Sequence, residues 1–513
     1  MAQHNSTPYE IYQEIFSYIS DDDKATLSAC SQISPWFRKS MQERMLRCVN
    51  LEYSEKCVTD FTNYGRKSIV WADDSSGSSK SERLLSALES SQELAKYIKE
   101  LKITIKTHDH NPGHHAVYET TTANVLLPYL FSLTTLSVLS TSSSPYETYS
   151  KPLQSIIRQL FEKNTNLTNV NLSGIYGFSI AEVQHLPSNV NSLTLSTISN
   201  LRPLLPGENA SSPGDKDGLT FTPISLYIKD TAHVGDFISA LRCGVQVRDQ
   251  YTYNIIHEYK RRAPYLSFAM LESLEISNIK TLVVANLRAL LSFVDPQKLQ
   301  NLRFQTPLSV YTIYSISFQD SQPFNFMFGY DSGLSESPKL DLAGFSRLKS
   351  LEVSGAMMFT QGIVNSFSTG IGSSFSTMTT NIPWISQVID RLPHPDHSLM
   401  SAVENTQGPS LRSIRVVFEV TLTVMNDMNQ ALDAFSLFDF SPLINSIKSI
   451  QRRYQHLHDV VGSLDFQVKV QGHDDHIPIF QRDKFVEALS ENHTLQNGAG
   501  HNEVLVRVLT LDT

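Results

Sequence analysis

The sequence predicts an α/β fold in which three N-terminal helices precede a series of short parallel strands. Two features of its 513 residues support this fold class. A six-residue phrase with apolar first, fourth and sixth positions recurs from residue 98 onward, as expected of strands with one buried face. The intervals between its copies contain apolar residues at helical spacing, so each strand is expected to have a return segment.

The first fifty residues predict three short helices. Pro8 suits the first turn of a helix, where the N–H that proline lacks would have no partner. The Asp21–Asp23 run ends this helix and begins a second, and Ser34–Phe37 begins the third. So small a core leaves apolar surface exposed, which predicts a binding partner. The apolar face of the first helix contains Pro8, Ile11, Tyr12, Ile15, Phe16 and Ile19, and that of the second contains Leu27, Cys30 and Ile33.

The order of residues in this segment carries a resemblance to a known family. Pro8, Glu10, Ile11, Ile15, Phe16, the acidic run, Leu27 and Trp36 follow the pattern of an F-box, whereas Thr7 and Tyr12 depart from it. The resemblance implies that the helices bind a Skp-type adaptor and thereby a cullin-type ubiquitin ligase. The alternative is an N-terminal three-helix cap on a larger domain. The implied adaptor-binding residues are Pro8, Ile11, Ile15, Phe16, Ile19, Leu27 and Trp36.

The phrase has eight strict copies, whereas chance gives roughly two in a chain of this length. Side chains alternate along a strand, so the fourth and sixth positions should be buried and the fifth should face outward. The fourth positions, predicted to lie buried on one parallel sheet, are Leu101, Leu136, Val170, Leu193, Leu274, Leu302, Leu351 and Ile414. Looser copies begin at Leu46, Val461 and Val506.

The phrase resembles that of leucine-rich repeats, in which such strands stack in parallel. Only the steps from Leu167 to Val190 and from Leu271 to Leu299 have the roughly 20–29-residue length of standard repeats. The chain is therefore similar to the divergent leucine-rich-repeat halves of F-box proteins, especially the fungal type. This resemblance implies an F-box-like module over residues 1–50 and an irregular leucine-rich-repeat solenoid with a parallel sheet over residues 51–513.

Other segments of the chain predict insertions and helices. Three polar stretches cannot bury an apolar face, so we expect disordered insertions at residues 72–81, 206–218 and 366–381. Apolar spacing predicts helices over Ser81–Tyr97, Pro152–Phe161, Ala232–Arg262, Ile382–Leu392 and Pro442–Leu457.

The fifth positions of the phrase form the candidate target-binding face. They are mainly small and neutral in the N-terminal half, and acids and bases alternate in the C-terminal half. An alternating row can pair with a complementary surface and disfavour a mismatched one. The alternative is a solvated face with weak cross-strand pairs. These residues, predicted to lie on the more open face, are Lys102, Ser137, Asn171, Thr194, Glu275, Arg303, Glu352 and Arg415.

The sequence predicts no catalytic residue, metal site or cofactor. His108–His115 is the best metal candidate, but its central Pro-Gly predicts a solvated loop, and His394–His397 and His473–His476 also lie in predicted loops. No G-x-S-x-G, phosphate-binding or dinucleotide-binding glycine motif is present. The chain is therefore not expected to be an enzyme, although an enzyme built of strand–helix units is a third alternative.

Composition bounds the class of partner and the compartment. A net charge of −9 without a long basic run argues against nucleic-acid binding. No stretch approaches the roughly 18 consecutive apolar residues of a membrane span. Four cysteines without a C-x-x-C pair, and no signal sequence, favour a reducing compartment, so we expect a cytoplasmic or nuclear protein.

The resemblance implies a function for the whole chain. It implies the substrate-recognition subunit of an SCF-type ubiquitin ligase, whose N-terminal helices bind the Skp adaptor of the cullin ligase. The solenoid would then hold a target protein, unidentified by the sequence, while other subunits transfer ubiquitin. The alternative is a leucine-rich-repeat interaction scaffold that is not linked to ubiquitination.

Overall fold

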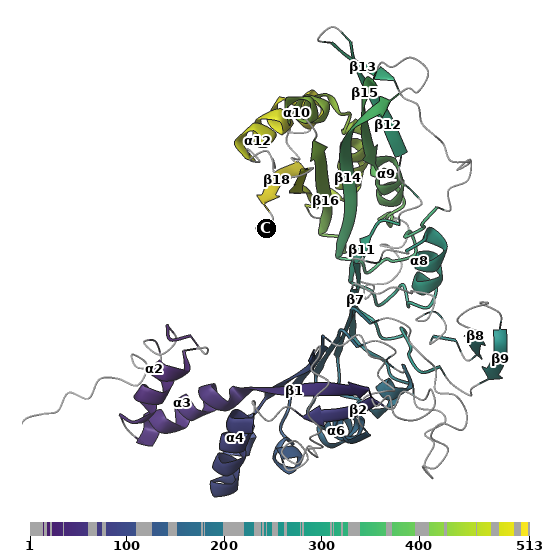
Figure 1. Ribbon diagram of the computed structural model, residues 1–513. Helices are drawn as coiled ribbons and strands as arrows, with labels where there is room; N and C mark the ends of the chain where they lie inside the picture. Colours follow the sequence, from purple (N-terminus) through teal and green to yellow (C-terminus); the bar gives the residue numbers. More distant parts are fainter. Residues whose placement is uncertain are drawn as a thin grey trace, which may run out of the picture. The chain divides into compact units, whose positions relative to one another are not determined.

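The computed structural model shows two compact units, unit 1 with Met1–Pro223 and Arg242–Leu266, and unit 2 with Ile224–Leu241 and Ser267–Thr513. Figure 1 labels their helices and strands. The residues that the structure describes are 14, 18–20, 23–33, 35–59, 69–73, 78–108, 126–141, 151–175, 178, 180–198, 220–229, 238, 241–242, 244–248, 255–260, 264–277, 279, 282–307, 310, 312–319, 322–326, 339–365, 372–395, 410–424, 428–457, 459–472, 482–496 and 504–510.

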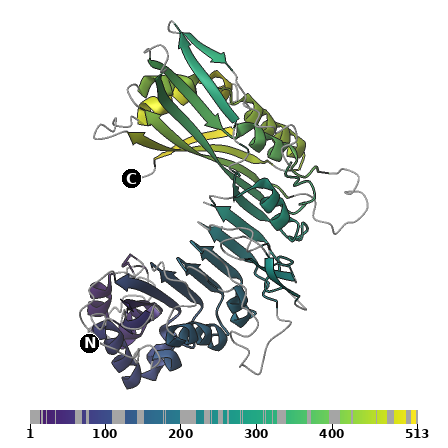
Figure 2. The same ribbon diagram turned by 45° about the vertical axis from the view of Figure 1, so that its right-hand side comes forward.

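Unit 1 contains the N-terminal helices together with a mainly parallel sheet. Helix α3 (Pro35–Arg47) is followed directly by strand β1 (Cys48–Thr59). Strands β1, β3, β4, β5 and β6 pair in parallel in that order, and β2 pairs antiparallel with β1. Figure 2 shows the parallel strands side by side. The further strands are β2 (Ile69–Asp73), β3 (Glu100–His108), β4 (Thr135–Ser140), β5 (Asn169–Ser173) and β6 (Ser192–Ser196).

A helical return segment connects most successive strands of unit 1. These segments are α4 (Ser78–Ser90) and the 3-10 helix η2 (Gln92–Tyr97) before β3, η3 (Leu127–Tyr129) before β4, α6 (Lys151–Lys163) before β5 and η5 (Ile180–His185) before β6. Helix α6 agrees with the predicted helix Pro152–Phe161, and its Ile156, Ile157 and Leu160 are buried. The predicted helix Ser81–Tyr97 is divided between α4 and η2.

The N-terminal helices begin where the acidic run and Pro35 predict. Asp23 is the N-cap of α2 (Lys24–Ser31), and its carboxylate accepts the Thr26 N–H at 3.0 Å and the Thr26 hydroxyl at 2.6 Å. The pKa of Asp23 is lowered mainly by the hydrogen bond from the Thr26 hydroxyl, and further by the hydrogen bond from the Thr26 backbone N–H. Leu27 is buried, whereas Ile33 is 67% exposed because α2 ends before it.

Strands β5 and β6 end in similar turns. Gly174 and Thr197 directly follow the two strands and have positive φ angles of 71° and 54°. A Cβ on Gly174 would lie 1.8 Å from the Ser140 carbonyl oxygen, so only glycine fits there. Thr197 adopts a similar backbone conformation despite its β-branched side chain, which is unfavourable.

Unit 2 also contains mainly parallel strands. The parallel order is β7, β10, β11, β14, β16, β17 and β18. Strand β14 also pairs antiparallel with β15, which pairs with β12, and β12 pairs with β13. The strands are β7 (Ser225–Lys229), β10 (Ser273–Ser277), β11 (Asn301–Gln305), β12 (Thr312–Gln319), β13 (Gln322–Phe326), β14 (Ser350–Asn365), β15 (Gly372–Thr380), β16 (Ser413–Val424), β17 (Val461–Gly472) and β18 (Val504–Thr510).

Helices pack against the apolar face of this sheet. Trp384 of α9 meets Phe304 of β11 edge-on, with ring centroids 6.2 Å apart. A Cβ on Gly462 of β17 would lie 2.5 Å from the Ile447 side chain of α11, so this glycine lets the helix approach closely. The helices of unit 2 are α8 (Val284–Leu291), α9 (Ile382–Asp390), α10 (Met428–Leu437), α11 (Ser441–Tyr454), α12 (Arg482–Glu491) and α13 (His493–Gln496).

The predicted α/β class and the parallel strands are confirmed. All eight fourth positions of the phrase are at most 2% exposed. Leu101, Leu136, Val170 and Leu193 share one register row in unit 1. Leu274, Leu302, Leu351 and Ile414 share another row in unit 2.

Two sequence predictions about secondary structure are wrong. Strand β15 occupies Gly372–Thr380 within the expected insertion 366–381, because its Ser and Thr residues suit a strand and Met378 is buried. The expected helix Ala232–Arg262 instead contains an antiparallel pair, β8 (Gly244–Arg248) and β9 (Ile255–Lys260).

The other two expected insertions are described only in part. In the range 72–81, β2 extends to Asp73 and α4 begins at Ser78. The range 206–218 lies outside the described residues.

Candidate functional site

The fifth positions of the phrase in unit 1 form one row of side chains, all of which are neutral except for a single basic residue. By register, Asn50 of β1 lies beside Lys102, followed by Ser137, Asn171 and Thr194. All five are exposed or half-buried, whereas the residues on either side of them in each strand are buried. The predicted alternation therefore holds across this sheet, and its outward row has little charge.

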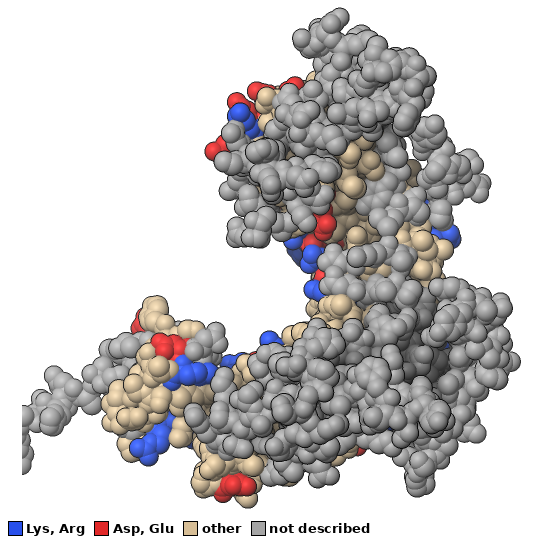
Figure 3. All heavy atoms as spheres, in the orientation of Figure 1, with Lys and Arg blue, Asp and Glu red and all other residues tan. Residues whose placement is uncertain are grey.

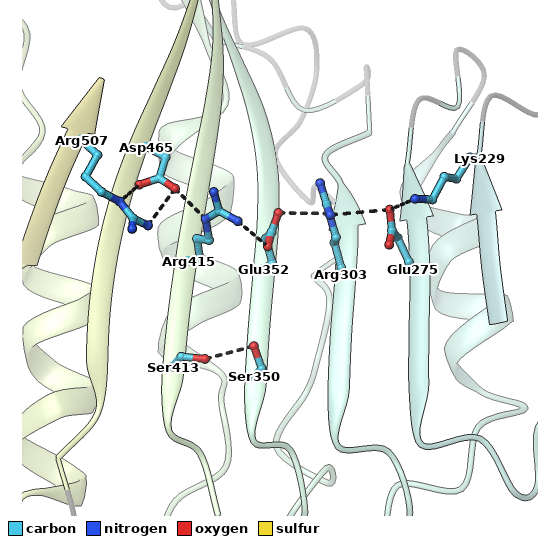
Figure 4. Close-up of polar contacts among 9 residues, drawn as sticks. All are labelled: Lys229, Glu275, Arg303, Ser350, Glu352, Ser413, Arg415, Asp465 and Arg507. Carbon is cyan, nitrogen blue, oxygen red and sulfur yellow. Dashed lines mark hydrogen bonds and ion pairs between the residues drawn. The ribbon is translucent and has the colours of Figure 1, made fainter. Parts of the chain in front are cut away.

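The fifth positions of unit 2 form a charged row. Glu275, Arg303, Glu352 and Arg415 are register partners on β10, β11, β14 and β16. Figure 4 shows these side chains on the near face of the strands, with helices behind the sheet. The sequence therefore placed these four residues on a common face correctly.

Ion pairs connect this row from strand to strand, as the dashed lines in Figure 4 show. We use the name charged row for the seven residues that they join: Lys229, Glu275, Arg303, Glu352, Arg415, Asp465 and Arg507. Glu275 Oε1 lies 3.0 Å from Lys229 Nζ and 3.7 Å from Arg303 Nη1. Glu352 lies 3.0 Å from Arg303 Nε and 3.2 Å from Arg415 Nη1.

The strongest contacts of the charged row surround Asp465. Arg415 Nε donates to Asp465 Oδ2 at 2.6 Å. Arg507 donates from Nε to Oδ1 at 2.7 Å and from Nη2 to Oδ2 at 3.0 Å, a bidentate contact. Burial alone would lower the pKa of Arg415, but the hydrogen bond that Arg415 donates to Asp465 and the charges of Glu352 and Asp465 raise this pKa above its usual value.

Acids and bases differ in exposure along the charged row. The carboxylate side chains of Glu275, Glu352 and Asp465 are 0–15% exposed, whereas the four basic side chains are 36–51% exposed. Basic and acidic side chains are visible together at the surface near β11 and β16 (Figure 3). Glu275 lies on the expected face of the sheet, but the residue is only 7% exposed because Lys229 and Arg303 contact its carboxylate.

Sequence reasoning missed three members of the charged row. Asp465 is the fifth position of the looser copy that begins at Val461, so extending the row to that copy would have found it. Lys229 is the last residue of β7, and the phrase on this strand has Pro223 in place of its first apolar residue. Arg507 pairs with Asp465 in register, whereas the looser copy at Val506 gave Thr510 as the outward residue.

The copies of the phrase on β16 and β17 are not in register, because β17 is displaced along β16 by one pleat. Leu464 of β17 lies beside Val416, and Gly462 lies beside Ile414. Arg415 is therefore opposite Ser463, and it reaches along the sheet to Asp465. This displacement brings Arg415 and Arg507 to opposite sides of one carboxylate.

Most of the expected adaptor-binding residues cannot be placed. Pro8, Ile11, Ile15 and Phe16 lie outside the described residues. Ile19 is half-buried and its carbonyl accepts a hydrogen bond from Arg44 of α3. Two further residues of the expected set are described. Leu27 is buried in α2, and Trp36 lies in the first turn of α3.

The described residues contain no group of three or more His, Cys, Asp or Glu residues that could hold a metal ion. Most of the His108–His115 string lies outside them. Among the helices that the structure describes, none is long and apolar enough to cross a membrane. The chain matches no protein-family model and no curated protein sequence.

Proposed function

We propose that the chain is the substrate-recognition subunit of an SCF-type, cullin-based ubiquitin ligase. Its N-terminal helices bind a Skp adaptor, and unit 2 binds the target protein. The observation that carries the recognition half is the charged row, an ordered set of basic groups on the open face of a sheet. The adaptor half rests on the F-box resemblance of the first fifty residues.

The charged row has the physical properties of a recognition surface. Neighbouring strands hold its side chains at intervals of about 4.8 Å, so their spacing is fixed by the backbone. Buried carboxylates orient the arginines, which reduces the entropy lost when a ligand binds them. Alternating charge also sets the register of a partner, because a displaced partner brings like charges together.

The described N-terminal helices provide a folded base for adaptor binding. Lys24 Nζ of α2 donates to the Met45 carbonyl of α3 at 3.1 Å, and Leu27 and Met41 are fully buried. Helix α3 then leads directly into β1. An adaptor bound to these helices would therefore be connected to the first strand of unit 1 without an intervening linker.

Adaptor binding is tested with the double substitution Ile15→Asp and Phe16→Asp in the full chain. We expect at least a tenfold loss of affinity for a purified Skp adaptor, because two charges replace apolar contacts. The control is Phe131→Asp, which introduces a charge at a half-exposed apolar residue of unit 1 between η3 and β4. Undiminished adaptor binding by the double variant would refute the adaptor half, and so would absence of binding by the wild-type chain.

A further inference from the structure

The charged row is least compensated at its β18 end. Its four bases and three acids alternate, which gives a net charge of +1. Arg303 and Arg415 each contact two carboxylates, whereas Arg507 contacts one within the described part of the chain. At the other end, Lys229 also lies over the Tyr227 ring, with Nζ 5.8 Å from the ring centroid. The positive excess of the row is therefore located mainly at Arg507.

The Arg507 guanidinium is positioned to accept one further anionic group. Its Nε and Nη2 donate to Asp465, whose side chain is fully buried. A guanidinium has five N–H donors, and among the described residues the Nη1 donors of Arg507 have no hydrogen-bond partner. The Arg507 side chain is 51% exposed, the most of the four bases. Because the buried carboxylate already holds the group, it loses little freedom when a ligand binds.

Two half-exposed apolar side chains lie near Arg507 on the same face of the sheet. Leu505 and Arg507 are register partners of Ser463 and Asp465, so all four point to the face that carries the charged row. Val461 is two residues before Ser463 and points the same way. Leu505 is 48% exposed and Val461 is 51% exposed. We use the name edge patch for Val461, Ser463, Leu505 and Arg507.

The edge patch lies on a strand that lacks the usual protection of a sheet edge. In the described sheet, β18 pairs with β17 alone. Edge strands commonly carry Lys or Pro, which discourage contact with another chain, but the β18 sequence VLVRVLT contains neither. Exposed apolar residues beside one charged group are typical of an interaction site.

We propose that the edge patch binds an extended segment of the target protein that carries one apolar and one acidic side chain, two residues apart. This inference rests on the recognition half of the proposed function and names the chemical class of the segment. The apolar side chain covers Leu505 and Val461, and the carboxylate accepts hydrogen bonds from the Nη1 donors of Arg507. One carboxylate balances the single positive charge of the row.

The spacing of the two ligand side chains follows from the geometry of β18. Leu505 and Arg507 are two residues apart on one strand, a separation of about 7 Å. Alternate residues of an extended ligand have the same separation and the same direction, whereas adjacent residues point to opposite sides. A segment with an apolar residue, any residue and then an acid therefore contacts both groups, and the reverse order does so as well.

The test measures binding of short peptides to the full-length chain by fluorescence anisotropy at low salt. The main probe is a Thr-rich peptide with capped ends that contains Leu-Thr-Asp, because Thr favours an extended chain and the caps remove the terminal charges. Asn in place of Asp should weaken binding about fivefold through loss of one exposed ion pair. Ser in place of Leu should weaken it by a similar factor through loss of apolar contact.

Substitutions in the edge patch assign the two contacts separately. Arg507→Gln should abolish the preference for Asp over Asn but keep the preference for Leu over Ser, which shows that the fold is intact. Leu505→Ser should have the opposite effect, and Arg507→Lys should keep both preferences. The matched controls are Arg288→Gln on α8 and Val486→Ser on α12, both at exposed side chains, and neither should change either preference.

Four results would overturn the inference. The first is no binding, or equal binding of the Asp and Asn probes, by the wild-type chain. The second is a preference for Asp that persists in Arg507→Gln. The third is equal binding of a probe in which Leu and Asp are adjacent. The fourth is tighter binding of an Asn probe with a free C-terminal carboxylate, which would assign Arg507 to a chain end. None of these probes involves the adaptor, so failure here is distinct from failure of adaptor binding by the N-terminal helices.

Discussion

Asp465 is the residue whose environment depends most on the ion pairs. It is fully buried, and Arg415 and Arg507 provide all three of its described charged contacts. We expect Asp465→Asn to lower the free energy of unfolding by about 1–3 kcal/mol, because charged hydrogen bonds are lost within a buried site. Chemical denaturation measures this, with Asp433→Asn on the exposed side of α10 as the control expected to stay within about 0.5 kcal/mol. An equal effect at both positions would contradict the account.

Leu274 and Glu275 are adjacent residues with different roles. Leu274→Ala should cost on the order of 2–5 kcal/mol, because it leaves a cavity in a packed core. Glu275→Ala should cost about 1–2 kcal/mol through lost ion pairs, although the sequence alone would place this residue on an open face with little effect on stability. Denaturation of both variants checks the order, and a larger loss for Glu275→Ala would contradict it.

Tyr454 should make stability depend on pH in the alkaline range. Burial raises the pKa of Tyr454 to about 12, and its hydroxyl donates to the Pro393 carbonyl at 3.0 Å. The unfolded chain ionises this group near pH 10, so its contribution is complete below about pH 10 and is lost as pH rises toward 12.

The matched variant Tyr454→Phe isolates this effect. The stability advantage of the wild-type chain over the variant should be constant below pH 10 and decrease between pH 10 and 12. Thermal unfolding across this range measures the difference. A difference that is independent of pH would show that Tyr454 is not buried as described.

At the scale of secondary-structure elements, substitutions at similar positions in the turns after β5 and β6 should have opposite effects on the free energy of unfolding. Gly174→Ala should lower the free energy of unfolding by more than about 1 kcal/mol, because its Cβ would collide with the Ser140 carbonyl at a positive φ. Thr197→Gly should raise it by about 0.5–1 kcal/mol, because glycine relieves the unfavourable φ of a β-branched residue. Chemical denaturation measures both, and the same sign of effect at both positions would contradict the description of these turns.

The strands that carry the phrase could be predicted because buried and outward side chains alternate along them, and this period of two residues is visible in the sequence. Leu101, Leu274 and Ile414 are buried as that period requires. Strand β15 could not be predicted in the same way, because its burial depends on pairing with the extended end of β14. Asp465 could have been found as the fifth position of the looser copy at Val461, but its contact with Arg415 depends on the register of β17, which the sequence does not show.

For the whole molecule, the parallel α/β organisation followed from the sequence, but the division into two units did not. The unit boundaries pass through the predicted solenoid, and Arg242–Leu266 belongs to unit 1 although the neighbouring chain belongs to unit 2. No composition change marks these positions, because the division depends on contacts between distant segments. The F-box and leucine-rich-repeat assignments rest on resemblance, and the charged row supports only the recognition part of the proposal.

The most direct test of the central claim is a quantitative comparison of what the full chain captures from cells. Wild-type chain, the Ile15→Asp and Phe16→Asp double variant, and an Arg303→Gln and Arg507→Gln double variant are each purified and analysed by mass spectrometry. We predict that the N-terminal variant loses the Skp adaptor and cullin but retains the target, whereas the arginine variant retains the adaptor and loses the target. Recovery of the adaptor with both variants, or with none of the three chains, would contradict the account.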